Sequence, residues 1–302
     1  MNIFFFNPCR NGDVHVSRTY IRDIINKLPN NKYYYIQNHL YTRGFILRDI
    51  RDLNKSSFDV NRINPDASII QMPEATFVNT WYGQSNFKYF PPLSKNNADS
   101  CSFYILYDLF KDIFNFLNIE LESFQFYLPQ INFDRIEKTK EIDIFFQNNT
   151  FEKYVLICDN PVQSGQSSNF DFKPILKELS DTYKDVAFIS TSPNNFNHSP
   201  NLFSTNEIIN LDFDLNEISY LSTKCDTIVG RGSGPYTFSL ISENLLNESK
   251  KFVAFTNTEI VGLGLRQNDY KCQLNWSNDY SQDNIIKKIT STRPCDLLDV
   301  IN

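Results

Sequence analysis

The sequence predicts an α/β protein made of two Rossmann-like domains, each with a mainly parallel sheet. Short apolar runs alternate with helical patterns in both halves of the chain, which is the order typical of βαβ units. The chain has 302 residues, of which 41% are hydrophobic, and this is enough to fill two cores of ordinary size. We place the domains at residues 1–140 and 141–302, with the connecting segment near residues 129–153.

The first half opens with a strand over residues 2–6, because NIFFF is a continuous apolar run typical of a strand covered on both faces. A helix is expected over residues 17–28, where apolar side chains recur at intervals of three and four and Ser17 suits the N-cap. The other expected elements are strands over residues 32–37 and 67–72, a helix over residues 43–53 and an amphipathic helix over residues 102–121. The aromatic stripe of the last helix is expected to pack in the core.

The second half repeats the alternation. Residues 154–161 are expected to form a strand that runs into a turn, and residues 172–183 a helix with Pro174 in its first turn, where proline fits. The remaining elements expected are strands over residues 186–191, 207–212, 226–230 and 251–256, and helices over residues 216–224 and 234–246. Two consecutive α/β units are the simplest account of this order.

The charge and hydropathy of the chain bear on its partners and its location. A formal net charge of −6 and a pI near 5.2 give no basic surface of the kind that binds nucleic acid, which excludes nucleic acid as a partner. No apolar run approaches the ~20 residues of a membrane-spanning helix, and the first residues lack the basic flank of a signal peptide. We therefore expect a cytoplasmic protein without a transmembrane segment, and leave a peripheral membrane association and the oligomeric state open.

The metal-ligating residue types are scattered. The six cysteines form no C-x-x-C pair, which predicts reduced thiols, and the three histidines are too far apart for a metal signature. Asp212 and Asp214 form an Asp-x-Asp pair ahead of an expected helix, so capping is the expected role. The sequence predicts neither a metal nor another cofactor.

Three of the nine glycines stand together in VGRGSGP, between an expected strand and an expected helix. Glycine permits positive φ and lets an oxygen approach the backbone, and helix N-termini at the carboxyl ends of parallel strands bind phosphates. The spacing matches neither the dinucleotide motif nor the P-loop, so a tight turn without a ligand is the alternative. The predicted phosphate contacts are Gly230, Arg231, Gly232, Ser233, Gly234, Pro235 and Thr237.

The turn after the first expected strand, NPCRNGDVHVSR, places polar residues at the carboxyl edge of the first sheet. An aspartate there can take a proton from a substrate hydroxyl, and Asp13 can equally cap the following helix without a chemical role. His15 is a candidate base or ligand contact, with a solvated polar residue as the alternative. His39 follows the second expected strand and falls on the same edge, as a candidate acceptor contact.

Together these segments resemble the glycosyltransferases of the GT-B fold, most of all the bacterial heptosyltransferase group. In that group the first strand runs into a Gly-Asp-Val turn and a helix, as in NGDVHVSRTYIRDIINKLPNNKYYY, and a Gly-Pro helix start like that in GSGPYTFSL holds the donor phosphates. The resemblance implies two domains that face each other across a cleft, with Asp13 as the base that deprotonates the acceptor. The chain departs from the group in CDNPVQSGQSS, which has no basic residue and offers Gln163 and Ser164 as donor contacts.

The resemblance further implies an inverting, metal-independent hexosyl or heptosyl transferase of polysaccharide biosynthesis, which moves a sugar from a nucleotide sugar to a saccharide or glycoconjugate hydroxyl. The first domain is expected to bind the acceptor and the second the donor. Two alternatives stay open, a non-catalytic nucleotide-sugar-binding protein and a sugar-nucleotide epimerase on the same fold. The expected acceptor contacts are Asn11, Gly12, His15, His39, Arg43 and Trp81, the last by stacking on a sugar face.

Overall fold

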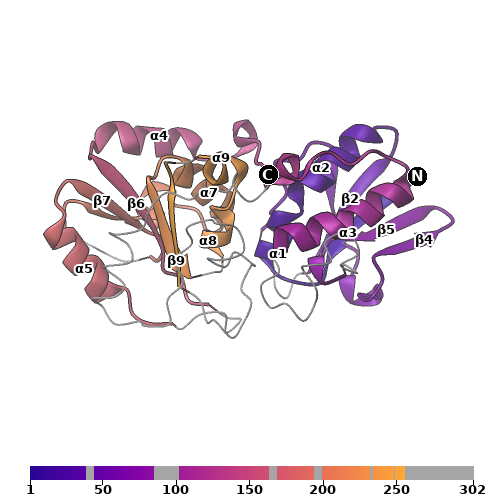
Figure 1. Ribbon diagram of the computed structural model, residues 1–302, viewed down its shortest axis with the longest axis horizontal. Helices are drawn as coiled ribbons and strands as arrows, with labels where there is room; N and C mark the ends of the chain where they lie inside the picture. Colours follow the sequence, from indigo (N-terminus) through magenta and orange to yellow (C-terminus); the bar gives the residue numbers. More distant parts are fainter. Residues whose placement is uncertain are drawn as a thin grey trace. The chain divides into compact units, whose positions relative to one another are not determined.

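The computed structural model describes residues 1–38, 44–84, 102–162, 169–193, 199–231, 234–247 and 249–255. The chain divides into two compact units, Met1–Arg135 and Ile136–Asn302. Each unit has a five-stranded sheet with helices around it (Figure 1). The predicted α/β class with two mainly parallel sheets is confirmed. The acceptor-binding and donor-binding roles of the two domains stay predictions.

The sheet of the first unit has the strand order β3-β2-β1-β5-β4, and β4 is antiparallel to β5 while the other pairs are parallel. The strand predicted at residues 2–6 is the central one. Its neighbouring side chains Phe5 and Phe6 point to opposite faces and are both fully buried, as expected of a strand covered on both sides. The strands are β1 (Asn2–Asn7), β2 (Lys32–Gln37), β3 (Leu53–Ser56), β4 (Ile69–Met72) and β5 (Ala75–Asn79).

Two helices follow β1 where one was predicted. The expected turn is helical from Asn11, so Asp13 lies in helix α1 (Asn11–Val16) rather than in a loop. Helix α2 (Arg18–Lys27) confirms the helix predicted at residues 17–28, although the Ser17 hydroxyl donates to the Val14 carbonyl at 2.9 Å instead of capping α2. The helix expected over residues 43–53 is wrong, because residues 44–52 form turns that lead into β3.

The core of the first unit is rich in stacked aromatic rings. Helix α3 (Ser102–Leu117) buries Phe110 and Phe114, which confirms that its aromatic stripe belongs to the core. The Tyr20 ring of α2 stacks on Phe110 and on Tyr127, with ring centroids 4.1 and 4.2 Å apart. Short 3-10 helices complete this unit, at Val60–Arg62, Tyr82–Gln84, Phe124–Tyr127 and Phe133–Arg135.

The sheet of the second unit is parallel throughout its described strands, in the order β10-β9-β6-β7-β8. The strand predicted over residues 207–212 is wrong, because residues 207 and 208 end a short helix (Thr205–Ile208) and residues 209–212 form no regular element. The strand of this region, Leu202–Ser204, comes just before that helix. The strands are β6 (Lys153–Cys158), β7 (Val186–Ser190), β8 (Leu202–Ser204), β9 (Thr227–Arg231) and β10 (Lys251–Phe255).

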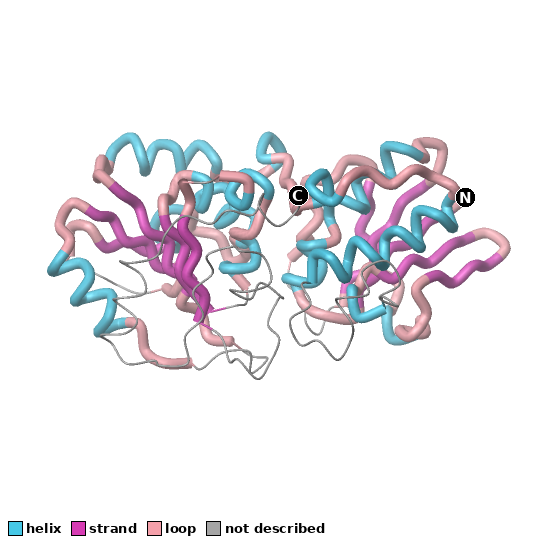
Figure 2. Tube along the Cα trace, viewed as in Figure 1, coloured by secondary structure: helices cyan, strands magenta, loops and turns pink. Residues whose placement is uncertain are grey.

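The helices of the second unit lie around this sheet (Figure 2). The single helix predicted over residues 234–246 is wrong in one respect, because the chain forms two one-turn helices there with Ser239, Leu240 and Ile241 between them. The helices are α4 (Thr139–Asn148), α5 (Lys173–Thr182), α6 (Thr205–Ile208), α7 (Leu215–Thr223), α8 (Pro235–Phe238) and α9 (Ser242–Leu245).

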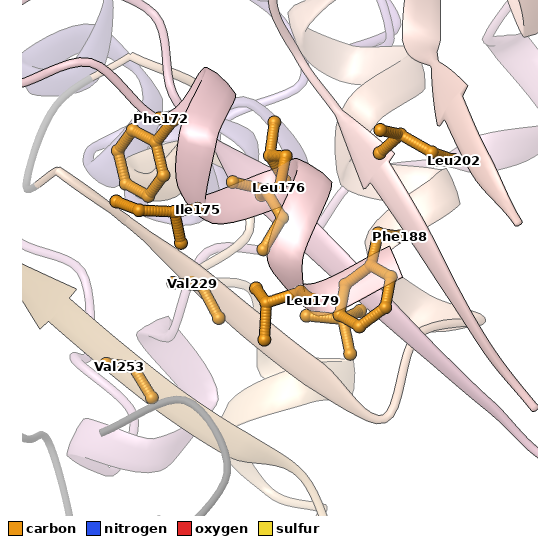
Figure 3. Close-up of a cluster of buried hydrophobic side chains, with 10 residues drawn as sticks. Phe172, Ile175, Leu176, Leu179, Phe188, Leu202, Val229 and Val253 are labelled. Carbon is orange, nitrogen blue, oxygen red and sulfur yellow. The ribbon is translucent and has the colours of Figure 1, made fainter. Parts of the chain in front are cut away.

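Helix α5 covers one face of this sheet. Figure 3 shows its apolar side chains Ile175, Leu176 and Leu179 packed among residues of the sheet, and the whole cluster draws on all five strands. Phe252 precedes Val253 in β10 and so points to the other face, where its ring meets the edge of Tyr236 from α8. Both faces of the second sheet are therefore covered, as a parallel sheet requires. The strand contributions to the α5 cluster are Val155, Ile157, Phe188, Leu202, Val229 and Val253.

Two further expectations concern membrane-spanning helices and the state of the cysteines. Within the described part of the chain, no helix is long and apolar enough to cross a membrane. Cys9, Cys158 and Cys225 are free thiols, and the other three cysteines lie outside the described residues.

Candidate functional site

Asp13 lies at the carboxyl edge of the first sheet, in the first turn of the helix that follows the central strand β1. The backbone N–H of Arg10 donates to Asp13 Oδ2 at 3.2 Å. This is the hydrogen bond by which an acidic residue in a first turn holds the chain entering its helix. The capping role weighed for Asp13 is therefore present.

The Asp13 carboxyl binds its proton unusually tightly. Burial raises its pKa from 3.8 to about 6, and the Arg10 hydrogen bond and positive charge offset only part of this effect. A carboxylate with a pKa close to neutral accepts protons more readily than an exposed one and is still ionised at pH 7. Asp13 has the properties of a general base.

Two weakly acidic groups near Asp13 stay neutral. Burial and then the charge of Asp13 raise the pKa of Cys9 to about 12. Burial also raises the pKa of Tyr35 far above its ordinary value, with the charges of Asp13 and Cys9 adding to it. Of these three groups, Asp13 is the one that carries negative charge at neutral pH. Asn11 Oδ1 is buried beside it without a hydrogen-bond partner in the described ranges.

Asparagines at the strand ends shape this edge. The Asn7 side chain accepts a hydrogen bond from the backbone N–H of Cys9 at 2.9 Å and donates to the Thr80 hydroxyl at 3.4 Å. The Asn38 amide, after β2, donates to the Pro8 carbonyl at 2.9 Å. These residues were not predicted, although the sequence carries a signal for them, because Asn7 ends the apolar strand β1 and Asn38 follows directly on β2.

The predicted acceptor contacts fall into three groups. Asn11 and Gly12 lie with Asp13 in α1, whereas the His15 side chain is 0% exposed and packs inside the unit, which favours a structural role. Trp81 is half-buried just after β5, and Gly83 leaves room for its ring, since a Cβ at Gly83 would lie 2.6 Å from it. His39 and Arg43 lie outside the described residues.

Gly230 and Gly234 of the second unit meet different structural requirements. Gly230 is inside β9 opposite Cys158, and a Cβ on it would lie 2.5 Å from the Cys158 Cβ, so strand packing requires glycine. Gly234 has a φ of 45°, and no described residue lies within 4 Å of the position of its absent Cβ. It provides the positive φ and the open approach that a phosphate oxygen needs. Pro235 follows as the first residue of α8.

The rest of the predicted phosphate site is less complete than expected. Helix α8 has four residues, so only a few peptide dipoles align behind its first amides. The Thr237 side chain is fully buried, and its hydroxyl has no hydrogen-bond partner within the described part of the chain. The other predicted donor contacts lie outside the described residues: Gly232, Ser233, Gln163 and Ser164.

The Arg231 side chain is buried and faces the protein's own backbone. It is 3% exposed, and its guanidinium donates to the backbone carbonyls of Asp159, Asn160 and Phe170. The predicted phosphate contact is therefore without support, because these donors are directed at the protein's own backbone. Nothing in the sequence near Arg231 signals this, since its partners lie more than sixty residues earlier.

Some of the residues considered for metal binding lie in the described part of the chain. Within the ranges that the structure covers, no group of three or more His, Cys, Asp or Glu side chains could hold a metal ion. Asp214 occupies the N-cap position of α7, as predicted, without a side-chain capping bond. Burial, and then the charge of Glu217, raises its pKa to about 6.

Comparison with known proteins identifies the fold. No protein-family model and no curated protein matches the chain. A solved glycosyl transferase family 9 structure from Veillonella parvula DSM 2008 is 10% identical, covers 96% of both chains and has a TM-score of 0.54.

Two E. coli structures score lower over similar shares of the chain. Heptosyltransferase WaaC with ADP is 7% identical over 96% of this chain and 99% of its own, with a TM-score of 0.48. ADP-heptose lps heptosyltransferase II is 11% identical over 96% and 98%, with a TM-score of 0.43. The resemblance predicted from the two turns is confirmed at the level of the fold: the chain has the α/β architecture of the Veillonella glycosyl transferase.

Proposed function

We propose that this chain is a glycosyltransferase that moves a sugar from a nucleotide-sugar donor to a hydroxyl of a saccharide acceptor. The observation that carries the proposal is the Asp13 carboxyl, which lies at the carboxyl edge of the first sheet with a pKa raised to about 6. The fold likeness to a glycosyl transferase supports the reaction class, and the site residues supply the chemistry.

Asp13 serves as the base in this reaction. The acceptor hydroxyl gives its proton to the Asp13 carboxylate as its oxygen attacks the anomeric carbon of the donor. The bond from that carbon to the diphosphate oxygen breaks, and its electron pair leaves with the nucleoside diphosphate. One displacement of this kind inverts the anomeric configuration. Positioned proton acceptors contribute roughly a hundredfold to ten-thousandfold to such rates.

The second unit holds the donor. The backbone at Gly234 has room for a phosphate oxygen, and the first amides of α8 lack partners within their own helix. These amides stabilise the negative charge that develops on the diphosphate as the sugar leaves. The reaction requires the sugar held there to reach the hydroxyl at Asp13.

A thermal-shift screen with UDP, ADP, GDP, CDP and their sugars finds the donor, because a ligand of the native state raises the melting temperature. Release of nucleoside diphosphate from that donor is then measured with a panel of mono- and disaccharide acceptors. The Asp13→Asn variant should keep donor affinity and lose at least about a hundredfold in kcat. Asp66→Asn removes an exposed carboxylate of the same unit and should leave kcat unchanged.

Each alternative gives a different result. An Asp13→Asn variant with normal kcat removes the assignment of the base. Donor binding without transfer to any acceptor points to a binding protein, and conversion of the donor sugar without an acceptor points to an epimerase. A wild-type chain that binds none of these nucleotides contradicts the proposed function.

A further inference from the structure

Arg231 ends the strand β9 and is buried at the carboxyl edge of the second sheet. Its guanidinium lies against two adjoining aromatic rings, with the centroids of Phe170 and Phe172 each 4.8 Å from its central carbon and 4.5 Å from each other. Arginine stacks on aromatic faces while keeping its N–H groups free to donate in the plane. Arg231 is therefore fixed in orientation by rings that belong to the chain leading into α5.

The N–H groups of Arg231 donate to backbone carbonyls on both sides of the connection between β6 and α5. Nη1 donates to the carbonyls of Asp159 and Asn160, the latter at 3.3 Å, on the side that leaves β6. Nη2 donates to the carbonyl of Phe170, on the side that enters α5. One planar cation thus joins the two sides to the end of a third element, β9.

Asn169 also joins the two sides of the connection between β6 and α5. Its side-chain oxygen accepts from the Val162 N–H at 2.7 Å, and its side-chain amide donates to the Val162 carbonyl at 3.0 Å. This pair reproduces the two hydrogen bonds of a strand pairing with a side chain in place of a backbone. The two sides are therefore held together at Val162 and Asn169 as well as through Arg231.

Asp159 extends the connection to β7. Its carboxylate accepts from the Ser190 hydroxyl at 2.9 Å and from the Ser192 N–H at 3.0 Å. Side chains thus connect the carboxyl ends of β6, β7 and β9. This is the edge at which the loops of a parallel sheet form ligand sites. We call the group Asp159, Asn169 and Arg231 the strand-end clamp.

Burying a guanidinium costs desolvation free energy, and apolar side chains of similar volume often stabilise a fold at least as well. What the guanidinium supplies is a fixed geometry for three chain segments: the end of β9, which leads to Gly234, the backbone after β6 and the backbone before α5. We propose that Arg231 is a positioning residue for nucleoside diphosphate binding, acting through the backbone after β6 and before α5 rather than by touching phosphate. This inference rests on the proposed function of the second unit as the donor-binding unit.

The test compares Arg231→Met and Arg231→Lys with wild type. Lysine keeps the charge but has no planar fork with which to hold carbonyls on both sides. Both variants should bind the nucleoside diphosphate selected by wild type about tenfold more weakly or worse, by calorimetry. The measurement is made at a temperature at which every variant is fully folded, so that lost stability alone does not change Kd. A direct phosphate contact predicts instead that lysine restores most of the affinity.

Asn169→Leu provides a second route, since Asn169 is exposed and its loss should not prevent folding. It removes both hydrogen bonds to Val162 and should weaken nucleotide binding severalfold with little change in Tm. Lys177→Met is the matched control, because Lys177 is an exposed cation of the same unit, on α5. Amide exchange over residues 153–162 and 169–172 should quicken in the Arg231 and Asn169 variants and not in the control.

Two outcomes overturn this inference and leave the proposed function intact. The first is a folded Arg231→Met or Asn169→Leu chain with wild-type Kd. The second is recovery of affinity in Arg231→Lys. If wild type itself binds no nucleoside diphosphate, the proposed function fails and this inference fails with it.

Discussion

Asp13 links the stability of the first unit to pH. Its pKa is raised in the folded chain from 3.8 to about 6, so the folded state prefers the protonated carboxyl. The stabilisation that follows is fully present below the unfolded pKa, near 4, and is lost as the pH rises through about 6. At neutral pH the folded chain therefore holds a buried carboxylate that lowers its stability. An ionisable group with a strongly shifted pKa is typical of a functional site.

Replacing this carboxylate should stabilise the protein. Asp13→Asn keeps an oxygen that can accept from the Arg10 N–H and removes the buried charge. We expect the free energy of unfolding at pH 7.5 to rise by up to about 3 kcal/mol, the equivalent of the pKa shift. The gain should shrink towards pH 4, where wild-type Asp13 is protonated. Urea unfolding at both pH values measures it, and a gain that is equal at pH 4 and pH 7.5 would contradict the linkage.

The pairing of β6 with β9 requires a glycine at position 230. Gly230 faces Cys158, and a Cβ there would lie 2.5 Å from the Cys158 Cβ and 2.7 Å from its carbonyl oxygen. Neither strand can move aside, because both belong to the centre of the sheet. Gly230→Ala should therefore lower the free energy of unfolding by about 3 kcal/mol.

Gly234→Ala is the control for this prediction. Among the described residues its Cβ would meet nothing within 4 Å, so the cost is the backbone strain of φ 45° and ψ −117°, about 1 to 3 kcal/mol. Urea unfolding of the two variants should rank Gly230→Ala as the less stable. The opposite order would show that the turn, and not the strand pairing, sets the requirement for glycine.

The break between α8 and α9 shows what periodicity could not predict. The apolar spacing in GPYTFSLISENLL is that of one helix. In the fold the Ser219 hydroxyl of α7 donates to the Phe238 carbonyl at 2.6 Å, and the Asn244 amide donates to the Ser239 carbonyl at 2.8 Å. These side chains satisfy the last carbonyls of α8 and end it. The contact with α7 depends on tertiary structure, which local propensity does not include.

The turns at residues 44–52 have a similar cause. The buried Arg18 guanidinium of α2 donates to the Ile46 carbonyl at 3.1 Å and pairs with Asp49 at 3.5 Å. Asp49 also accepts from the Asn132 N–H at 3.1 Å. A helical pattern in the sequence is overridden here by polar groups from two distant segments. The preceding strand β2 followed its apolar run as predicted, whereas β3, with the sequence LNKS, was not predicted.

The candidate site was predictable to the extent that it follows from strand order. Parallel strands deliver the residues after them to one edge, so Asp13 could be placed there from the sequence. The role of Arg231 could not be predicted in this way, because it depends on carbonyls of Asp159 and Phe170 in another loop. Strand ends reveal which residues gather at an edge, and only the folded contacts show whether a side chain faces a ligand or its own backbone.

At the scale of the whole molecule, the chain is two compact units with separate sheets and cores. Asp13 belongs to the first unit, and Gly234 and the strand-end clamp belong to the second. A donor nucleotide without its sugar or acceptor should therefore act on the second unit. A ligand that binds only the native state stabilises it by about 2.7 kcal/mol at a concentration of about 100 times Kd.

This division gives the last prediction, which hydrogen exchange can test. Saturating nucleoside diphosphate should slow amide exchange in the second unit, most of all after β6 and around α8, where the proposed contacts lie. Exchange in α1 and around Asp13 should stay as in the free protein, because no part of the proposed nucleotide site belongs to the first unit. Equal protection around Asp13 would mean that the nucleotide also contacts the first unit. The assignment of donor and acceptor to separate units would then be wrong, even if transfer itself were observed.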